Sequence, residues 1–144
     1  MKNRLLLLFL TTLALASCTD KKKLITRKWL AKEIVVAGVT IRVDEVPPTS
    51  NGKKFEAYLE LDEDGDYEFM LPEDYEHPRY SDKVKGEWRI NDDGTVLTLK
   101  PEGEDKEKWK VVLLNKNLLE VQRKEKQDGV EVSMTFKFAP EEAE

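Results

Sequence analysis

The single histidine of this 144-residue sequence is the side chain best suited to general-base or metal chemistry at neutral pH. His77 lies in a long polar stretch where Glu73 or Glu76 could join it on a metal ion. No motif carrying a nucleophile accompanies it, and a solvated loop histidine is the alternative that we favour. We therefore expect no catalysis, no bound metal and no other cofactor.

A second group with chemical potential is the run of acids around Gly65, which has the alternating carboxylates of a calcium loop. With Gly65 as the sixth position of such a loop, the first position is Glu60 and the twelfth is Leu71. The twelfth position requires a bidentate Glu. The Asp64-Gly65 pair is therefore read as a hairpin turn.

Cys18 is the only cysteine, and the residues before it indicate a covalent modification. Lys2 and Arg4 precede an apolar run that ends in the small residues Ala16 and Ser17, the order of a secretory signal. The stretch Leu15-Ala16-Ser17-Cys18 resembles the bacterial lipobox. The resemblance implies that residues 1–17 are a signal peptide and that Cys18 becomes the N-terminus, acylated with chains such as palmitate, with the membrane as its partner.

Composition limits the remaining classes. The formal net charge of −5 argues against nucleic acid as a partner, and a single cysteine excludes a structural disulfide within the chain. Residues 18–26 form a polar tether after the signal peptide. Its three lysines, Lys21 to Lys23, are either a solvated spacer or a contact with anionic headgroups.

From Trp29 onward, apolar and polar residues alternate with a period of two, which indicates strands with one face on a core. Asp-Gly and Asn-rich turns between these runs indicate sequential hairpins. We predict an all-β fold, a single up-and-down antiparallel barrel over residues 27–139 with a polar tail at 140–144; a two-layer sandwich is the alternative. About eight strands are expected, near 28–36, 55–62, 66–71, 84–91, 95–100, 107–114, 118–124 and 130–138.

Loop lengths alternate along this meander and predict two unlike ends. The short turns, at 63–65, 92–94 and 115–117, share the end at which the chain enters the first strand. The long loops share the other end, which would be an open mouth facing away from the membrane; they lie at 44–54, 72–83, 101–106 and 125–129.

Three segments together resemble the lipocalin-like domains of small Gram-negative lipoproteins. They are Trp29 at the start of the first strand, residues 59–69 (LELDEDGDYEF) and residues 86–99 (GEWRINDDGTVLTL). The resemblance implies an eight-stranded barrel, often with a calyx for a small apolar ligand, in a lipoprotein of the cell envelope. It also implies the outer membrane, with the periplasmic or surface face left open.

The inward face is rich in rings, and two functions remain open. An aromatic pocket would bind a small apolar ligand, with Tyr75 and Tyr80 from the long loop as further contacts. If the rings instead fill the barrel, the protein is an interaction or accessory module for an envelope protein, with Tyr75, Arg79 and Tyr80 as its contact surface. The inward rings are Trp29, Phe69, Trp88, Trp109, Phe136 and Phe138, of which Phe69, Trp88, Trp109 and Phe136 are the candidate ligand contacts.

Overall fold

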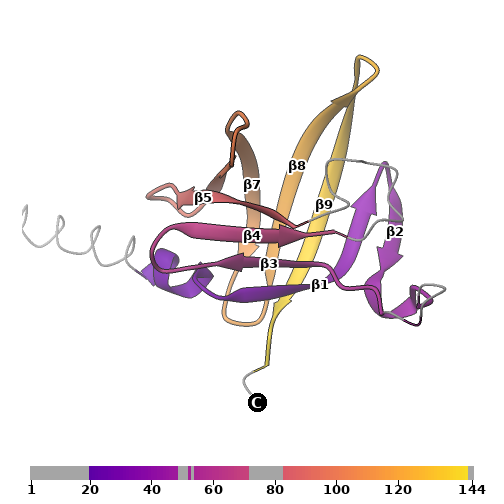
Figure 1. Cartoon of the computed structure of the whole chain (residues 1–144), viewed down its shortest axis with the longest axis horizontal. Helices are drawn as coiled ribbons and strands as arrows, with labels where there is room; N and C mark the ends of the chain where they lie inside the picture. Colours follow the sequence, from indigo (N-terminus) through magenta and orange to yellow (C-terminus); the bar gives the residue numbers. More distant parts are fainter. Residues whose placement is uncertain (1–19, 49–51, 53, 72–82, 143–144) are drawn as a thin grey trace, which may run out of the picture.

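The computed structural model describes residues 20–48, 52, 54–71 and 83–142. Residues 20–25 form a short helix, and an antiparallel sheet follows (Figure 1). Within the described part of the chain, no helix has the length and apolar character needed to cross a membrane. The strands are β1 (Lys28–Val36), β2 (Val39–Arg42), β3 (Tyr58–Leu61), β4 (Asp66–Met70), β5 (Val84–Ile90), β6 (Val96–Pro101), β7 (Glu107–Leu114), β8 (Leu119–Gln127) and β9 (Val130–Pro140), with a 3-10 turn, η1, at Val43–Glu45.

The sheet is a closed barrel. Its strand order is β2-β1-β3-β4-β5-β6-β7-β8-β9, and β1 also pairs with β9, which joins the two ends of the meander. Eight strands form the barrel and β2 lies outside the ring as a ninth. The predicted all-β antiparallel barrel is confirmed, and the sandwich alternative is wrong because a sandwich would leave β1 and β9 unpaired.

The barrel closes because β1 is long enough to pair with three strands. Along one of its edges, β1 pairs first with β3 and then with β2. Residues 28–30 pair with β3, residues 33–36 pair with β2, and the opposite edge pairs with β9 over most of its length. The register with β9 shifts between Ala31 and Glu33. Such a bulge bends a strand and increases its twist, which allows β1 to leave β3 while it stays paired with β9.

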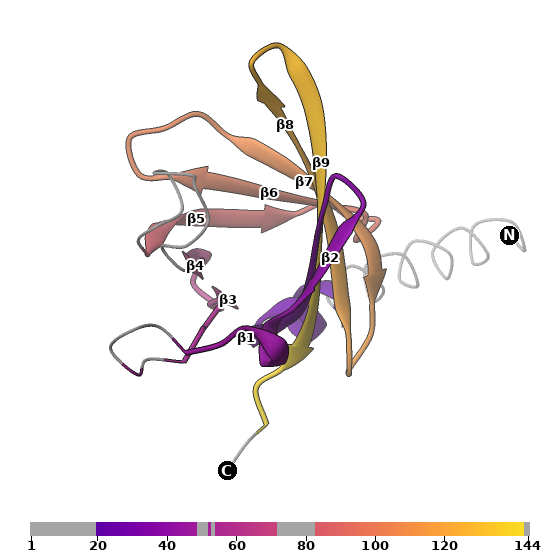
Figure 2. The ribbon, with the colours of Figure 1, turned by 90° about the vertical axis from the view of Figure 1, so that its right-hand side faces the viewer.

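Two features of the open end differ from the prediction. β2 was not expected; it follows a two-residue turn, Ala37-Gly38, in which both φ values are positive. The long loop expected at 125–129 is wrong, because β8 continues to Gln127 and turns at Asp128-Gly129, again with both φ values positive. These are the dihedral angles of a type I′ hairpin. The two hairpins, β1–β2 and β8–β9, project side by side at one end of the barrel (Figures 1 and 2).

The other end is closed by the helix at residues 20–25. Ile25 is fully buried, and the indole Nε1 of Trp29 donates a hydrogen bond to the carbonyl oxygen of Ile25 (2.8 Å). The folded body therefore begins inside the segment assigned to the tether; the remaining domain limits stay predictions. One core cluster fills the barrel between this helix and the hairpins.

Candidate functional site

The centre of the barrel is a cluster of four rings from β4, β7 and β9. The Phe69 ring meets Trp109 edge-on with centroids 5.2 Å apart and meets Phe136 at 5.7 Å. Phe136 stacks on Trp109 at 5.5 Å and on Phe138 at 5.8 Å. None of the four side chains is more than 2% exposed. Four of the six rings that sequence alternation placed inward are therefore packed on one another, the arrangement of a filled interior.

Trp88 does not belong to this cluster. It forms no ring contact with another described aromatic residue, and its Nε1 donates to the carbonyl oxygen of Asp62 (2.9 Å) near the helix end of the barrel. The candidate ligand contacts predicted as one site are thus divided between the middle and one end. Tyr75 and Tyr80 lie outside the described residues, as do Arg79, His77 and Cys18.

A buried arginine lies next to the ring cluster, towards the open end. Arg123 is 3% exposed, and its guanidinium carbon is 5.9 Å from the centroid of the Trp109 ring. Its Nε lies 3.5 Å from Oε2 of Glu107, and its Nη2 lies 3.3 Å from Oε2 of Glu125. The Trp109 Nε1 donates to the same Glu107 oxygen at 3.2 Å. Arg123 is thus one cation held between two carboxylates.

Arg123, Glu107 and Glu125 connect β7 and β8 where these two strands separate. The β7–β8 ladder ends at Lys110 and Gln122, beyond which β7 pairs with β6 alone and β8 pairs with β9 alone. An open hollow of about 410 Å³ lies between them, lined in part by Glu107, Arg123 and Glu125. Sequence reasoning missed Arg123, although alternation from Leu119 and Val121 places it on the inner face. A charged side chain is not expected on the inner face unless it has a partner. The burial of Arg123 is explained by the carboxylates of Glu107 on β7 and Glu125 on β8.

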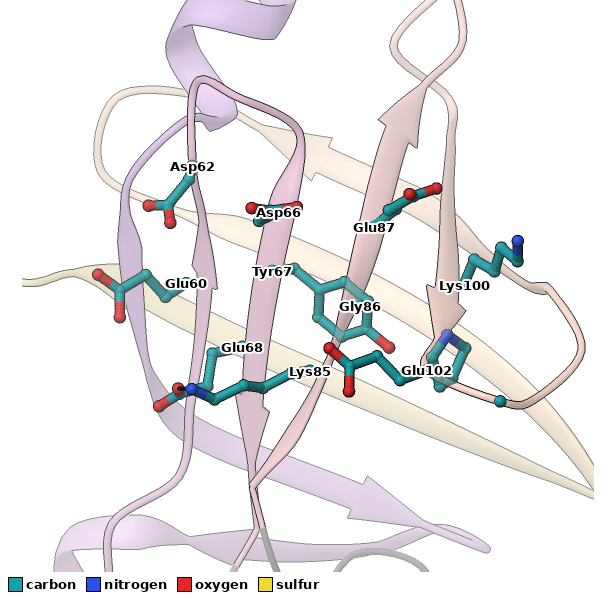
Figure 3. A pocket seen from close by; sticks show the side chains of 12 residues that line it. Glu60, Asp62, Asp66, Tyr67, Glu68, Lys85, Gly86, Glu87, Lys100 and Glu102 are labelled. Atoms are coloured by element: carbon teal, nitrogen blue, oxygen red, sulfur yellow. Dashed lines mark ion pairs between the residues drawn. The ribbon is translucent and has the colours of Figure 1, made fainter.

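A second hollow, of about 600 Å³, lies on the outer face of β3 to β6 (Figure 3). It forms where β5 and β6 approach closely at Gly86: a Cβ there would clash with the carbonyl oxygen of Lys100 and lie 2.9 Å from Cα of Pro101. Among the described residues, no group of histidine, cysteine or carboxylate side chains is placed to hold a metal ion. The lining is mainly acidic, with two lysines; its charged members are Glu60, Asp62, Asp66, Glu68, Lys85, Glu87, Lys100 and Glu102.

Glu68 on this face is the hub of a polar network. It accepts a hydrogen bond from Tyr58 Oη and forms ion pairs with Lys83 (2.9 Å) and Lys85 (3.3 Å). The hydrogen bonds from Tyr58 and then Lys83 hold the pKa of Glu68 at about 2, below its ordinary value of 4.5. Burial, together with the hydrogen bond to Glu68, raises the pKa of Tyr58. This network ties β3, β4 and β5 together on the outer surface.

A third hollow, of about 640 Å³, lies at the helix end of the barrel. Trp88 contributes to its wall, and the Nζ of Lys22 from the helix lies 5.9 Å from the centroid of that ring. Arg89 from β5 and Glu63 and Asp64 from the β3–β4 turn line it as well. This hollow, which we call the tether-end hollow, combines an aromatic wall with exposed charges of both signs.

Comparison with known proteins places this barrel in a family. A model described as the NlpE N-terminal domain matches residues 45–129, more than half of the chain. The chain belongs to the NlpE N-terminal domain family. This confirms the predicted resemblance to lipocalin-like domains of envelope lipoproteins, and it is consistent with a location in the cell envelope.

Two further comparisons complete this result. Among solved structures, the NlpE-family chain is similar to the bovine lipocalin allergen Bos d 2, with 14% sequence identity and a TM-score of 0.45. That match covers 82% of this chain and 73% of the allergen. No curated protein matches the sequence.

Proposed function

We propose that this NlpE-family protein is a lipid-anchored lipoprotein of the outer membrane whose barrel is an interaction or accessory module for another envelope protein. The packed ring cluster carries this proposal. Phe136 contacts three other rings and is fully buried, so the interior position that a calyx would leave open is occupied by the chain itself. Binding of a small apolar ligand is the alternative, and catalysis is not part of the proposal.

The anchor is proposed from sequence, and the fold is compatible with it. Cys18 lies two residues before the described helix, which caps the end opposite the projecting hairpins. A lipid on Cys18 would hold that capped end at the bilayer and leave the hairpins directed outward. The outer membrane, rather than another membrane of the envelope, rests on the family resemblance alone.

The surface that best suits a partner is the projecting pair of hairpins. Val39 and Val130, at the start of β2 and of β9, are 63% and 65% exposed. Val39 pairs with Val36, which packs on the core, so Val39 belongs to the same inner face of its hairpin. Two of the four large exposed apolar side chains among the described residues thus lie on the hairpins, and the other two, Val112 and Leu113, lie near the end of β7. The contact residues predicted from sequence, Tyr75, Arg79 and Tyr80, lie outside the described residues.

The edge of β2 indicates what kind of contact this could be. β2 is the last strand in the sheet order, and no described strand pairs with its outer edge. The turn at Ala37-Gly38 makes Val36 and Val39 a hydrogen-bonded pair, so the backbone N–H and C=O of Thr40 and Arg42 point away from β1. An extended segment of a partner protein can add to such an edge as a further strand.

A photo-crosslinking experiment tests this contact. A photoreactive residue at position 39 should yield a discrete adduct with one envelope protein in intact cells. Thr40→Pro removes the outward N–H without breaking the β1–β2 hydrogen bonds, so we expect the adduct to be lost. Thr40→Ala, which keeps that N–H, is the matched control and should retain it. An adduct of equal yield in both variants would refute strand addition at this edge.

Titration of intrinsic tryptophan fluorescence with fatty acids and apolar dyes tests the filled barrel. We expect no saturable change, because the rings already occupy the interior. A saturable shift that disappears in Trp109→Phe while the fold is intact would instead establish a ligand site and favour the carrier alternative.

A further inference from the structure

The tether-end hollow carries exposed charges of both signs. Lys22, Lys23 and Arg89 supply cations to its wall, and Glu63 and Asp64 supply carboxylates. All five side chains are exposed, and none forms an ion pair with another described residue.

The wall between these charges is aromatic and apolar. Trp88 is 7% exposed and its Nε1 is already bonded to the carbonyl oxygen of Asp62, so the ring is held in a fixed orientation. Ile90 continues this wall along β5. A tryptophan next to lysine and arginine is the combination found where proteins meet the headgroup region of a bilayer.

The position of the hollow follows from the length of the chain before it. Cys18 precedes the first helical residue, Asp20, by two residues, so their Cα atoms are at most about 7 Å apart. Lys22 and Lys23, on the same short helix, line the hollow. If Cys18 is acylated, the hollow cannot lie far from the bilayer surface.

We propose that the tether-end hollow binds the headgroup of a phosphoethanolamine lipid in the membrane that holds Cys18. The phosphate lies against Lys22, Lys23 and Arg89, and the primary ammonium lies against Glu63 and Asp64. A headgroup with phosphate alone would match only the cations of the hollow, whereas phosphoethanolamine also matches its two carboxylates. The proposal rests on the proposed acylation of Cys18, and it assigns the anchored barrel a defined orientation on the membrane.

The test uses the mature acylated protein in vesicles that contain a lipid with a fluorescence quencher on its headgroup. The vesicles are phosphatidylcholine alone, or phosphatidylcholine with added phosphatidylethanolamine or phosphatidylglycerol. The emission of Trp88 is identified as the part that is lost in Trp88→Phe. We expect stronger quenching of Trp88 with phosphatidylethanolamine than with either other composition.

Two double variants separate the parts of the site. Lys23→Glu with Arg89→Glu should reduce the quenching to the level seen in phosphatidylcholine. Glu63→Gln with Asp64→Asn should remove the preference for phosphatidylethanolamine over phosphatidylglycerol. Lys106→Glu with Lys108→Glu, an equal charge reversal at the other end of the barrel, is the control and should change neither result.

Each other outcome would refute a different part of the proposal. Equal quenching in all vesicles from a protein that still co-floats with them would refute the headgroup site and leave the anchor standing. If the protein preferred phosphatidylglycerol, and Glu63→Gln with Asp64→Asn did not change that preference, the headgroup site would be refuted. The binding would then be a general attraction of basic side chains to anionic lipid. A Trp88 shift produced by soluble glycerophosphoethanolamine without vesicles would refute the bilayer as the source. Failure to co-float would refute the anchor and the headgroup site together.

Discussion

Replacing Phe136 by leucine tests whether the barrel interior is a close-packed core. The fully buried Phe136 ring makes three ring contacts, to Phe69, Trp109 and Phe138. Each such contact contributes on the order of 0.5–1.5 kcal/mol beyond burial of area. Leucine removes all three and leaves a small void, so we expect a loss of about 2–4 kcal/mol in the free energy of unfolding. The melting temperature should fall by roughly 10 °C.

The measurement is urea unfolding of the purified protein, followed by far-UV circular dichroism, with Phe55→Leu as the matched control. Phe55 packs on the edge of the core and forms no ring contact with another described residue. We expect this control to lose about 1 kcal/mol or less. Equal losses in the two variants would contradict the packed cluster. The filled barrel would then lose its support, and the carrier function would become the better proposal.

Three further predictions concern the polar groups and the close strand pair. Glu68→Gln should lower the free energy of unfolding by about 1 kcal/mol at neutral pH, a small loss because the lysine partners of Glu68 are exposed. Folding lowers the pKa of Glu68 to about 2. In acid unfolding curves, the difference in stability from the unmodified protein should therefore shrink as pH falls from about 4.5 towards 2. Gly86→Ala should destabilise the barrel by about 1–3 kcal/mol in urea, because the added Cβ meets backbone atoms of β6 and not a movable side chain. Arg123→Met alone should lower the free energy of unfolding by about 3–5 kcal/mol, because Glu107 and Glu125 would stay largely buried without the cation between them. The triple variant Arg123→Met with Glu107→Gln and Glu125→Gln should recover most of that loss. A triple variant no more stable than the single one would refute the charge argument.

Much of the fold could be predicted from alternation and turn chemistry. Eight of the nine strands and the inward position of all six rings follow from a period of two, because strand side chains alternate between faces whatever the rest of the chain does. β2 was missed because four residues after an Ala-Gly pair give a weak signal. The end of β8 was missed because its polar residues resemble a loop, although they form a regular ladder with β9.

The candidate sites were less predictable than the strands. Trp88 and Trp109 share an inward face in sequence, and the structure places them at different levels of the barrel, one in the tether-end hollow and one beside Arg123. Alternation gives the face of a residue but not its height or its neighbours across the barrel. Those depend on the register of strands far apart in the chain.

The sequence by itself determined eight of the nine strands, the short turns at 63–65, 92–94 and 115–117, the inward set of rings and the lipobox-like segment before Cys18, since each of these depends on residues close together in the chain. Tertiary structure decided the closure of β1 on β9, the separation of β7 from β8 around Arg123, and the packing of four rings into one cluster. It also decided the tether-end hollow, which needs the helix, the β3–β4 turn and β5 in one place. Each of these depends on contacts between distant segments and on how completely their side chains fill the space between them, and no local pattern specifies that volume.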